Sequence, residues 1–352
     1  MLSIISVTLY SQTSGRFKVT NVGGIQNTIG GVGALQNPNN ANYCVAVGYQ
    51  ALQNASGNYN TAVGCSTLVS NSGEGNTAIG YMSQFANSGG SYNTSVGYGT
   101  LSNNISGKAN TATGYLSLNS NTSGDSNTAN GYKSLMSNTT GLNNTAMGTS
   151  SLMNNTIGNN NTAVGHWALT SNITGSDNSI LGAHASKNAL DGSKNTVIGY
   201  NALLSNNHGN NNVSIGYMSG YNNQGSGNVF IGYQAGYNEI GSNKLYIANN
   251  SNTLPLIYGD FASGRVGINT ISPNSDLSIS PSSVGPKITL WDGGTSTWHY
   301  GLGVSPDQLN YHIVASSNSH VFYAGGKNGD GTELMRIRGD GKVTIGDGTI
   351  PT

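Results

Sequence analysis

A glycine recurs every 16 or 17 residues through most of this chain, and the repeat limits what the chain can fold into. Each unit reads approximately Asn-Thr-Ala-Val-Gly-Tyr-x-Ala-Leu-x-x-Asn-x-x-Gly-x-x. Such a unit is too short for two helices and their turns, and its Gly and Asn residues disfavour helix. Helical solenoids are therefore excluded. The thirteen marker glycines are Gly31, Gly48, Gly64, Gly80, Gly97, Gly114, Gly131, Gly148, Gly165, Gly182, Gly199, Gly216 and Gly232.

The residues before each marker glycine alternate with the period of two that is typical of a β-strand. A second short strand around Ala-Leu and an Asn/Gly turn would complete one coil. The sequence therefore predicts an all-β protein whose main part is a parallel β-solenoid, or β-roll, of about thirteen coils. Coils stacked at about 4.8 Å give a rod roughly 60 Å long.

Stacking would place equivalent residues of successive coils in columns. We expect Val or Ile before the glycine and Leu four residues after it to fill a thin interior, and Gly and Asn to occupy the corners. A buried Asn column four residues before the glycine can satisfy its amides between neighbouring coils. This predicted structural ladder comprises Asn60, Asn76, Asn93, Asn110, Asn127, Asn144 and Asn161.

A column of small residues lies two positions before the glycine. Its flat surface predicts close contact with another chain, and a cyclic homo-oligomer is the usual solution. A charge at Ala129 is then expected to abolish assembly, whereas a monomer would leave this face in solvent. The column includes Ala46, Ala62, Ala78, Ala112, Ala129, Ala146 and Ala163.

Composition separates the repeat from the rest of the chain. Of 51 Asn, 45 lie at or before residue 250, whereas 14 of the 26 charged residues follow residue 244. Short strand-like runs and Gly-Asp turns after residue 286 predict a small antiparallel β-domain, with Arg338-Gly339-Asp340 in a hairpin turn. We expect an N-terminal strand or lead-in at 1–26, the rod at 27–243, a connector at 244–285 and the β-domain at 286–352.

Charge argues against several classes of function. The net charge is zero and only 7% of the residues are charged. The chain therefore has no net positive charge to attract phosphate backbones or anionic lipid. No apolar run reaches the roughly 18 residues of a membrane span. Paired carboxylates, nucleophile motifs, phosphate loops and zinc-ligand spacings are missing from the sequence. We therefore expect no enzyme activity, cofactor, metal, nucleic acid or membrane.

The Asn-Thr-Ala-Val-Gly coils of residues 27–243 resemble the β-roll of trimeric autotransporter adhesin heads. They are more similar to the longer-period rolls of phage and large-virus fibre proteins. The resemblance implies a homotrimer and, beyond the C-terminal β-domain, an intramolecular chaperone that cleaves itself off. On that basis Thr352 is expected to end a mature chain.

The function that this resemblance implies is that of a virion fibre with a multivalent host-binding surface. Expected partners are copies of the chain, a host glycan or protein, and other virion proteins through the N-terminus. A cell-surface adhesin head and an ice-binding solenoid that uses the Thr column from Thr61 to Thr162 remain alternatives. The candidate contact residues are Trp167, Trp291, Trp298, Tyr115 and Tyr132.

Overall fold

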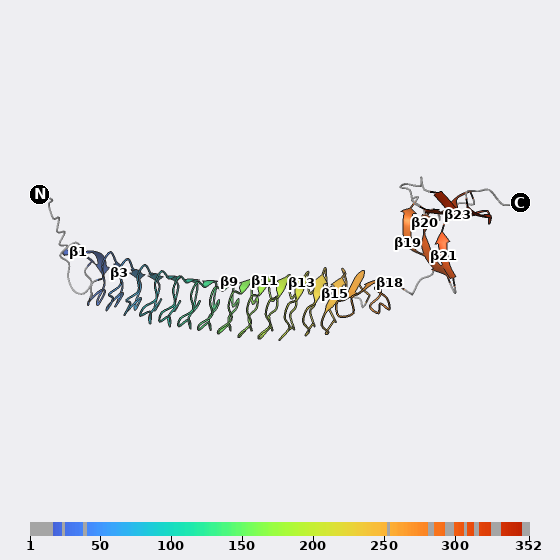
Figure 1. Ribbon diagram of the computed structural model, residues 1–352. Helices are drawn as coiled ribbons and strands as arrows, with labels where there is room; N and C mark the ends of the chain where they lie inside the picture. The colour runs from blue at the N-terminus through green and yellow to red at the C-terminus, as the bar shows by residue number, and fades with distance from the viewer. Residues whose placement is uncertain are drawn as a thin grey trace. The chain divides into compact units, whose positions relative to one another are not determined.

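The computed structural model describes residues 17–22, 25–37, 41–251, 254–280, 285–292, 299–305, 308–312, 317–324 and 332–346. All regular elements in these ranges are β-strands, as expected. The chain divides into two compact units, Met1–Leu277 and Ser278–Thr352 (Figure 1). Residues 1–16 of the expected N-terminal strand or lead-in and the end at Thr352 lie outside the described residues.

The first unit contains a parallel β-solenoid of thirteen coils, which confirms the predicted architecture. Strands of successive coils pair in parallel with equivalent residues opposite each other, as Ala146 opposite Ala163. The strands are β2 (Ile25–Gly30), β3 (Val45–Val47), β4 (Thr61–Val63), β5 (Thr77–Ile79), β6 (Thr94–Val96), β7 (Thr111–Thr113), β8 (Thr128–Asn130), β9 (Thr145–Met147), β10 (Thr162–Val164), β11 (Ser179–Leu181), β12 (Thr196–Ile198), β13 (Val213–Ile215) and β14 (Val229–Ile231).

The prediction of a second strand in each coil is wrong, because a turn occupies that segment. After the marker glycine the chain enters left-handed conformations at alternate residues, with φ of 123° at Gly114, 52° at Leu116 and 50° at Leu118. A coil of 16 or 17 residues must reverse direction within a few residues, and alternating positive φ turns the chain where a strand would continue straight. The turn still bonds to its neighbour, because Leu118 N donates to Ser134 O at 3.0 Å.

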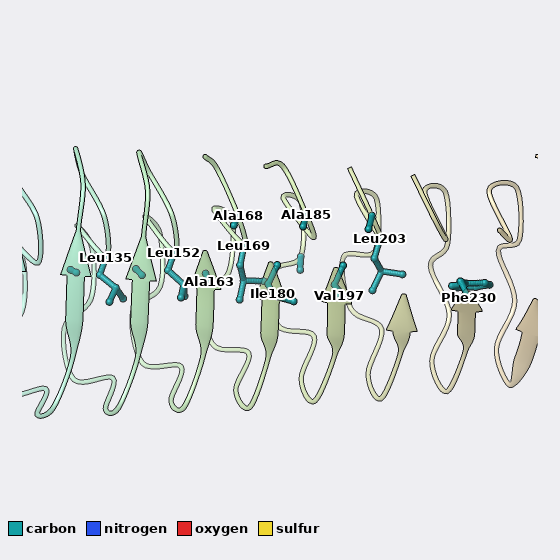
Figure 2. Close-up of a cluster of buried hydrophobic side chains, with 14 of the residues drawn as sticks. Leu135, Leu152, Ala163, Ala168, Leu169, Ile180, Ala185, Val197, Leu203 and Phe230 are labelled. Atoms are coloured by element: carbon teal, nitrogen blue, oxygen red, sulfur yellow. The ribbon is translucent and has the colours of Figure 1, made fainter. Parts of the chain in front are cut away.

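The interior of the rod reverses the predicted assignment of faces (Figure 2). Ala129 is fully buried, whereas Val96 is 37% exposed and Ile198 is 40% exposed. The Ala column therefore faces inward and the Val/Ile column faces outward. The reason is volume: the Leu column, predicted correctly as interior, fills most of the narrow coil, and in most coils a small side chain such as Ala occupies the strand centre beside it. An Ala129→Glu change would bury a charge inside the coil, so it cannot probe an interface.

At two places in the interior, a larger side chain at the strand centre is matched by a smaller residue at the Leu position. Phe230 replaces Ala at a strand centre, and the Leu positions beside it are Gly220 and Gly236. A Cβ added at either glycine would overlap the Phe230 ring. Likewise, Ile180 replaces Ala in a coil whose Leu position is Ser186. The core is thus filled by compensating substitutions, as close packing requires.

Antiparallel strands close both ends of the parallel stack. At the start, β1 (Phe17–Val22) pairs antiparallel with β2. At the other end, β15 (Lys244–Ile247) adds in parallel to β14, then β16 (Ile257–Asp260) and β17 (Arg265–Ile268) turn back antiparallel. An ion pair of 3.2 Å joins Lys244 Nζ to Asp260 Oδ1 across β15 and β16. The short strand β18 (Leu277–Ile279) follows.

The second unit contains two small antiparallel sheets, as predicted for the C-terminal region. One comprises β19 (Gly285–Asp292), β20 (His299–Ser305) and β21 (Gln308–His312). The other comprises β22 (Ser319–Ala324), β23 (Thr332–Arg338) and β24 (Val343–Ile345). Arg338 N donates to Lys342 O at 2.9 Å, so Arg338-Gly339-Asp340 lies in the predicted hairpin turn.

Candidate binding surface

The outward side chains of the strands, with the residue after each marker glycine, form one continuous surface that we call the outer face. It spans β3 to β14 and takes three positions from each coil: three residues before the glycine, one before it and one after it. In each three-residue strand the central side chain is buried and its two neighbours are partly or fully exposed, so both neighbours point outward. The outer face is therefore built by the same alternation that fills the core.

The outer face carries no Asp, Glu, Lys or Arg. Its first column is Thr in most coils, and Thr94, Thr111 and Thr162 are exposed. Its second column is mainly aliphatic. The exposed large residues of that column are Ile79, Val96, Met147, Leu181, Ile198, Ile215 and Ile231. An uncharged surface with so many exposed aliphatic side chains is typical of an interface.

Tyrosine rings stack along the third column. Tyr115 and Tyr132, two of the predicted contact residues, are 43% and 47% exposed, and their ring centroids lie 5.3 Å apart. They belong to a run of four stacked rings that also includes Tyr81 and Tyr98. Because stacked rings meet through their faces, a ligand would find mainly the edges and hydroxyl groups of the inner members.

Trp167 lies beside this column, where Tyr is replaced by His166. The centroids of these two stacked rings lie 4.8 Å apart, and the His184 ring stands at 71° to the indole with its centroid 5.2 Å away. Lys187 Nζ lies 4.1 Å from the indole centroid. Burial, Lys187 and His166 lower the pKa of His184. Neighbouring side chains thus already use the face of Trp167 that a sugar ring would need.

The other two tryptophans predicted as contact residues do not belong to the outer face. Trp291 lies in β19 of the second unit, where only the backbone is described, and Trp298 lies outside the described residues. The candidate surface of the rod therefore keeps Tyr115, Tyr132 and the half-buried Trp167.

The seven asparagines predicted as a ladder lie buried in one column. Asn110 represents them: its N and Nδ2 donate to Asn93 Oδ1 at 2.9 and 3.1 Å, and its Oδ1 accepts from Asn127 N at 2.9 Å. Its Nδ2 also donates to Gly124 O at 2.8 Å. The amides therefore tie each coil to both of its neighbours.

A second buried asparagine column lies seven residues after the marker glycine, and sequence reasoning missed it. Asn121 Nδ2 donates to Asn104 Oδ1 at 2.8 Å and to Gly124 O at 2.9 Å, so Gly124 O accepts from both columns. The Asn-x-x-Gly segment of the repeat was the available signal. The column comprises Asn71, Asn87, Asn104, Asn121, Asn138, Asn155, Asn172, Asn206 and Asn223.

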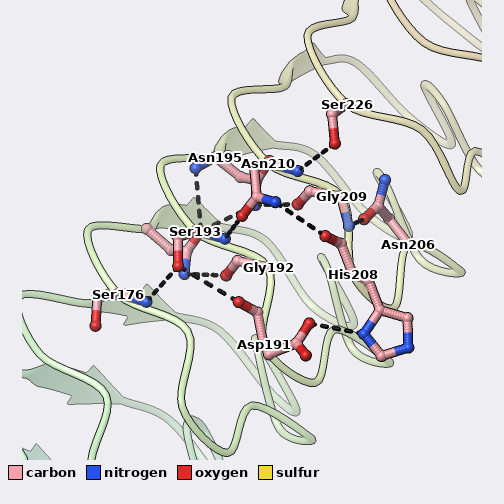
Figure 3. Close-up of polar contacts among 11 residues, drawn as sticks. Ser176, Asp191, Gly192, Ser193, Asn195, Asn206, His208, Gly209, Asn210 and Ser226 are labelled. Carbon is pink, nitrogen blue, oxygen red and sulfur yellow. Dashed lines mark hydrogen bonds and ion pairs between the residues drawn. The ribbon is translucent and has the colours of Figure 1, made fainter.

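Polar side chains also bridge successive coils along an edge of the rod (Figure 3). Ser176 N donates to Ser193 Oγ at 3.0 Å, Ser193 N to Asn210 Oδ1 at 2.7 Å, and Asn210 N to Ser226 Oγ at 3.0 Å. A hydrogen bond of 2.7 Å joins Asp191 Oδ1 and Nδ1 of the exposed His208 in the same region. This edge satisfies its own hydrogen bonds and carries charge, in contrast to the outer face.

We call β15 to β17 with their connections the C-terminal cap, and an open groove of about 540 Å³ lies where the aliphatic column meets it. Ile231 lines the groove from the column, and Ile247, Leu254 and Leu256 line it from the cap. The apolar surface therefore continues beyond the last coil.

The part of the chain that the structure describes holds no group of three or more His, Cys, Asp or Glu side chains placed for a metal ion. Within the same ranges, no helix is long and apolar enough to cross a membrane. Cys44 and Cys65 are free thiols, and burial raises the pKa of Cys44.

No protein-family model, curated protein or solved structure matches this chain.

Proposed function

We propose that this protein is a structural attachment protein: a homotrimeric fibre whose rods associate through the outer face and present repeated contacts to a host surface. The observation that carries the proposal is the uncharged outer face, with its exposed aliphatic column and stacked tyrosines. Soluble monomers rarely expose a contiguous apolar surface of this extent.

The size of the outer face suits association of chains. Twelve coils at about 4.8 Å by four residue steps at about 3.3 Å give roughly 750 Å² per chain. A stable interface buries roughly 800 Å² on each partner. Copies of the chain are a suitable partner, because an uncharged face loses no ion solvation when an identical face covers it.

The virion location and the host ligand rest on the resemblance of the repeats to viral fibre proteins. In that arrangement, weak contacts with a host glycan or protein repeat on each chain, and the effective concentration of linked sites raises the overall affinity. Tyr115 and Tyr132 lie in the column at the margin of the outer face, and their exposed hydroxyl groups are the proposed host contacts.

Light scattering after gel filtration tests the association. The expected mass is about three times that of the 36.2 kDa chain. Replacing Ile198 and Ile215 together by Lys places two charges in the aliphatic column, and the mass is expected to fall to that of one chain. The matched control is Asn188→Lys, at an exposed position outside the outer face, which should leave the mass unchanged. A monomeric wild-type chain would refute the proposal.

One observation favours a second candidate, ice binding. The Thr column lies on the outer side of a regular parallel sheet, and Thr94, Thr111 and Thr162 are exposed. A monomer with thermal hysteresis that disappears in Thr111→Lys would support this candidate over the fibre. A cell-surface adhesin head shares the fibre's geometry and differs in its anchor.

A further inference from the structure

Two polar residues interrupt the aliphatic column of the outer face. Thr113 ends β7 and Asn130 ends β8, and the two are partners in the parallel ladder. The Asn130 side chain is exposed. The aliphatic members before this pair are Val47, Val63, Ile79 and Val96, and those after it are Met147, Val164, Leu181, Ile198, Ile215 and Ile231.

We propose that Thr113 and Asn130 form a polar layer that fixes how copies of this chain align: parallel, and coil for coil. The inference rests on the proposed self-association. If one copy slides by two coils or more, both Asn130 amides lie against aliphatic side chains and are buried without hydrogen-bond partners, which is unfavourable. A slide of one coil leaves one of the two amides against Met147 in the same way. A single buried Asn sets the alignment of coiled-coil helices for the same reason.

Alignment coil for coil satisfies the polar layer. An Asn side chain has two donors and an acceptor, and a Thr hydroxyl donates and accepts, so each can pair with its own copy. Every aliphatic layer then also meets an equivalent layer. The alignment therefore brings polar groups together without exposing any part of the column.

An antiparallel arrangement also brings Thr113 opposite Asn130, but it covers the column poorly. Four aliphatic residues precede the pair and six follow it. Centred on the pair, Ile198 would meet Val47, Ile215 would meet Gly30, and Ile231 would extend past the first coil. The unequal lengths on the two sides thus favour the parallel arrangement.

Disulfide cross-linking tests the alignment in the full chain. The background replaces Cys44 by Asn, the residue that its column carries elsewhere, and Cys65 by Ser. Chains with Ile198→Cys are co-expressed with longer, tagged chains that carry Val164→Cys, two coils away. We expect each chain to link to its own kind after mild oxidation, with less than about a tenth of the product mixed, since linked Cα atoms lie within about 7 Å.

The variant Thr113→Val/Asn130→Val uses a residue that other coils already carry in this column, so folding should persist. It is expected to assemble with mixed products raised at least several-fold, because nothing then opposes sliding. Three results would overturn the polar layer while leaving self-association intact: mixed products in the unchanged chain, links between Ile198→Cys and Val47→Cys, or unchanged products in the double-valine variant. A monomeric chain in light scattering would overturn both this inference and the proposed function.

Discussion

Asn172 and Ala189 occupy successive positions of the second asparagine column, and Ala189 leaves Asn172 Oδ1 buried without a donor. Before this break each Asn donates to the previous coil, as Asn172 Nδ2 does to Asn155 Oδ1 at 2.8 Å. After it the direction is reversed, because Asn206 Nδ2 donates to Asn223 Oδ1 at 3.1 Å. One missing amide therefore divides the column into two segments of opposite direction.

Ala189→Asn should stabilise the rod. The new Nδ2 would donate to Asn172 Oδ1, and a satisfied buried acceptor contributes about 1–2 kcal/mol to the free energy of unfolding. The midpoint of denaturant unfolding measures the gain. Ala189→Leu is the matched control, because it adds similar bulk without a donor and should not stabilise. Equal effects of the two substitutions would show that volume, rather than the hydrogen bond, limits this coil.

Phe230→Ala should cost about 3–5 kcal/mol, because it opens a cavity in the core. Gly236→Leu in the same chain should recover part of that loss, since it restores the Ala/Leu pair of other coils. Gly236 has φ of 62°, close to the 51° of Leu203 at the equivalent position. In the Phe230 background, the same Gly236→Leu change should instead destabilise, because its Cβ overlaps the ring.

Thermal or denaturant unfolding of the four proteins in this cycle measures the coupling between the two sites. The expected result is a change of sign: Gly236→Leu stabilises the chain that carries Phe230→Ala and destabilises the chain that retains Phe230. Additive effects would mean that the two positions do not share one volume.

Asn127→Ala should cost about 2–3 kcal/mol, since it removes the acceptor for the backbone N of Asn144 and a donor to Gly141 O. Asn127→Asp should cost more at neutral pH, because the buried carboxylate cannot donate, and less below about pH 4, where the protonated acid can. Hydrogen exchange of the neighbouring coils measures both effects. The exposed Asn188→Ala serves as the control, and a similar loss there would contradict a specific role for the ladder.

Acid should loosen the C-terminal cap before the coils. The hydrogen bond and charge of Lys244 lower the pKa of Asp260. Burial lowers the pKa of Lys244, but the hydrogen bonds and charges of Asp260 and Tyr258 together outweigh it and raise that pKa. A carboxylate with a lowered folded pKa contributes stability above its ordinary pKa of about 4, and that contribution is lost as the pH falls through the folded value. The raised Lys244 pKa matters only in alkali, where the pair is lost as the lysine deprotonates.

Hydrogen exchange of β15 to β17 between pH 7 and pH 2 measures this effect. Protection is expected to fall in acid in the unchanged chain and to be lower but nearly independent of pH in Asp260→Asn. Equal acid sensitivity in both proteins would place the responsible group elsewhere.

The repeat predicted the solenoid, its coil number and the interior Leu column, because each follows from the spacing of residues along the chain. It did not predict which side of the strand faces inward. Alternation separates Ala129 from its neighbours Thr128 and Asn130, but only the width of the coil decides which set fits inside. With Leu135 in the interior, the smaller side chain of Ala129 is the one that fits.

The outer face could not be recognised from the sequence for the same reason, since its aliphatic column was assigned to the core. The second asparagine column was visible in the repeat, yet its burial depends on turns with positive φ at residues such as Leu118. Turns of that kind are not implied by period-two alternation. The exposed position of Tyr115 was predictable because Tyr recurs at a fixed position in an otherwise polar unit.

Because antiparallel strands cover the two ends of the stack, the number of coils between them can change without exposing either end. Each coil contacts only its neighbours, and β1 and β16 cover the first and last layers whatever number lies between them. Duplication of one 17-residue unit, such as residues 115–131, would lengthen the rod by about 4.8 Å and leave both ends unchanged. The reach of the protein can therefore change in fixed steps of one repeat without any change to the strands that end the stack.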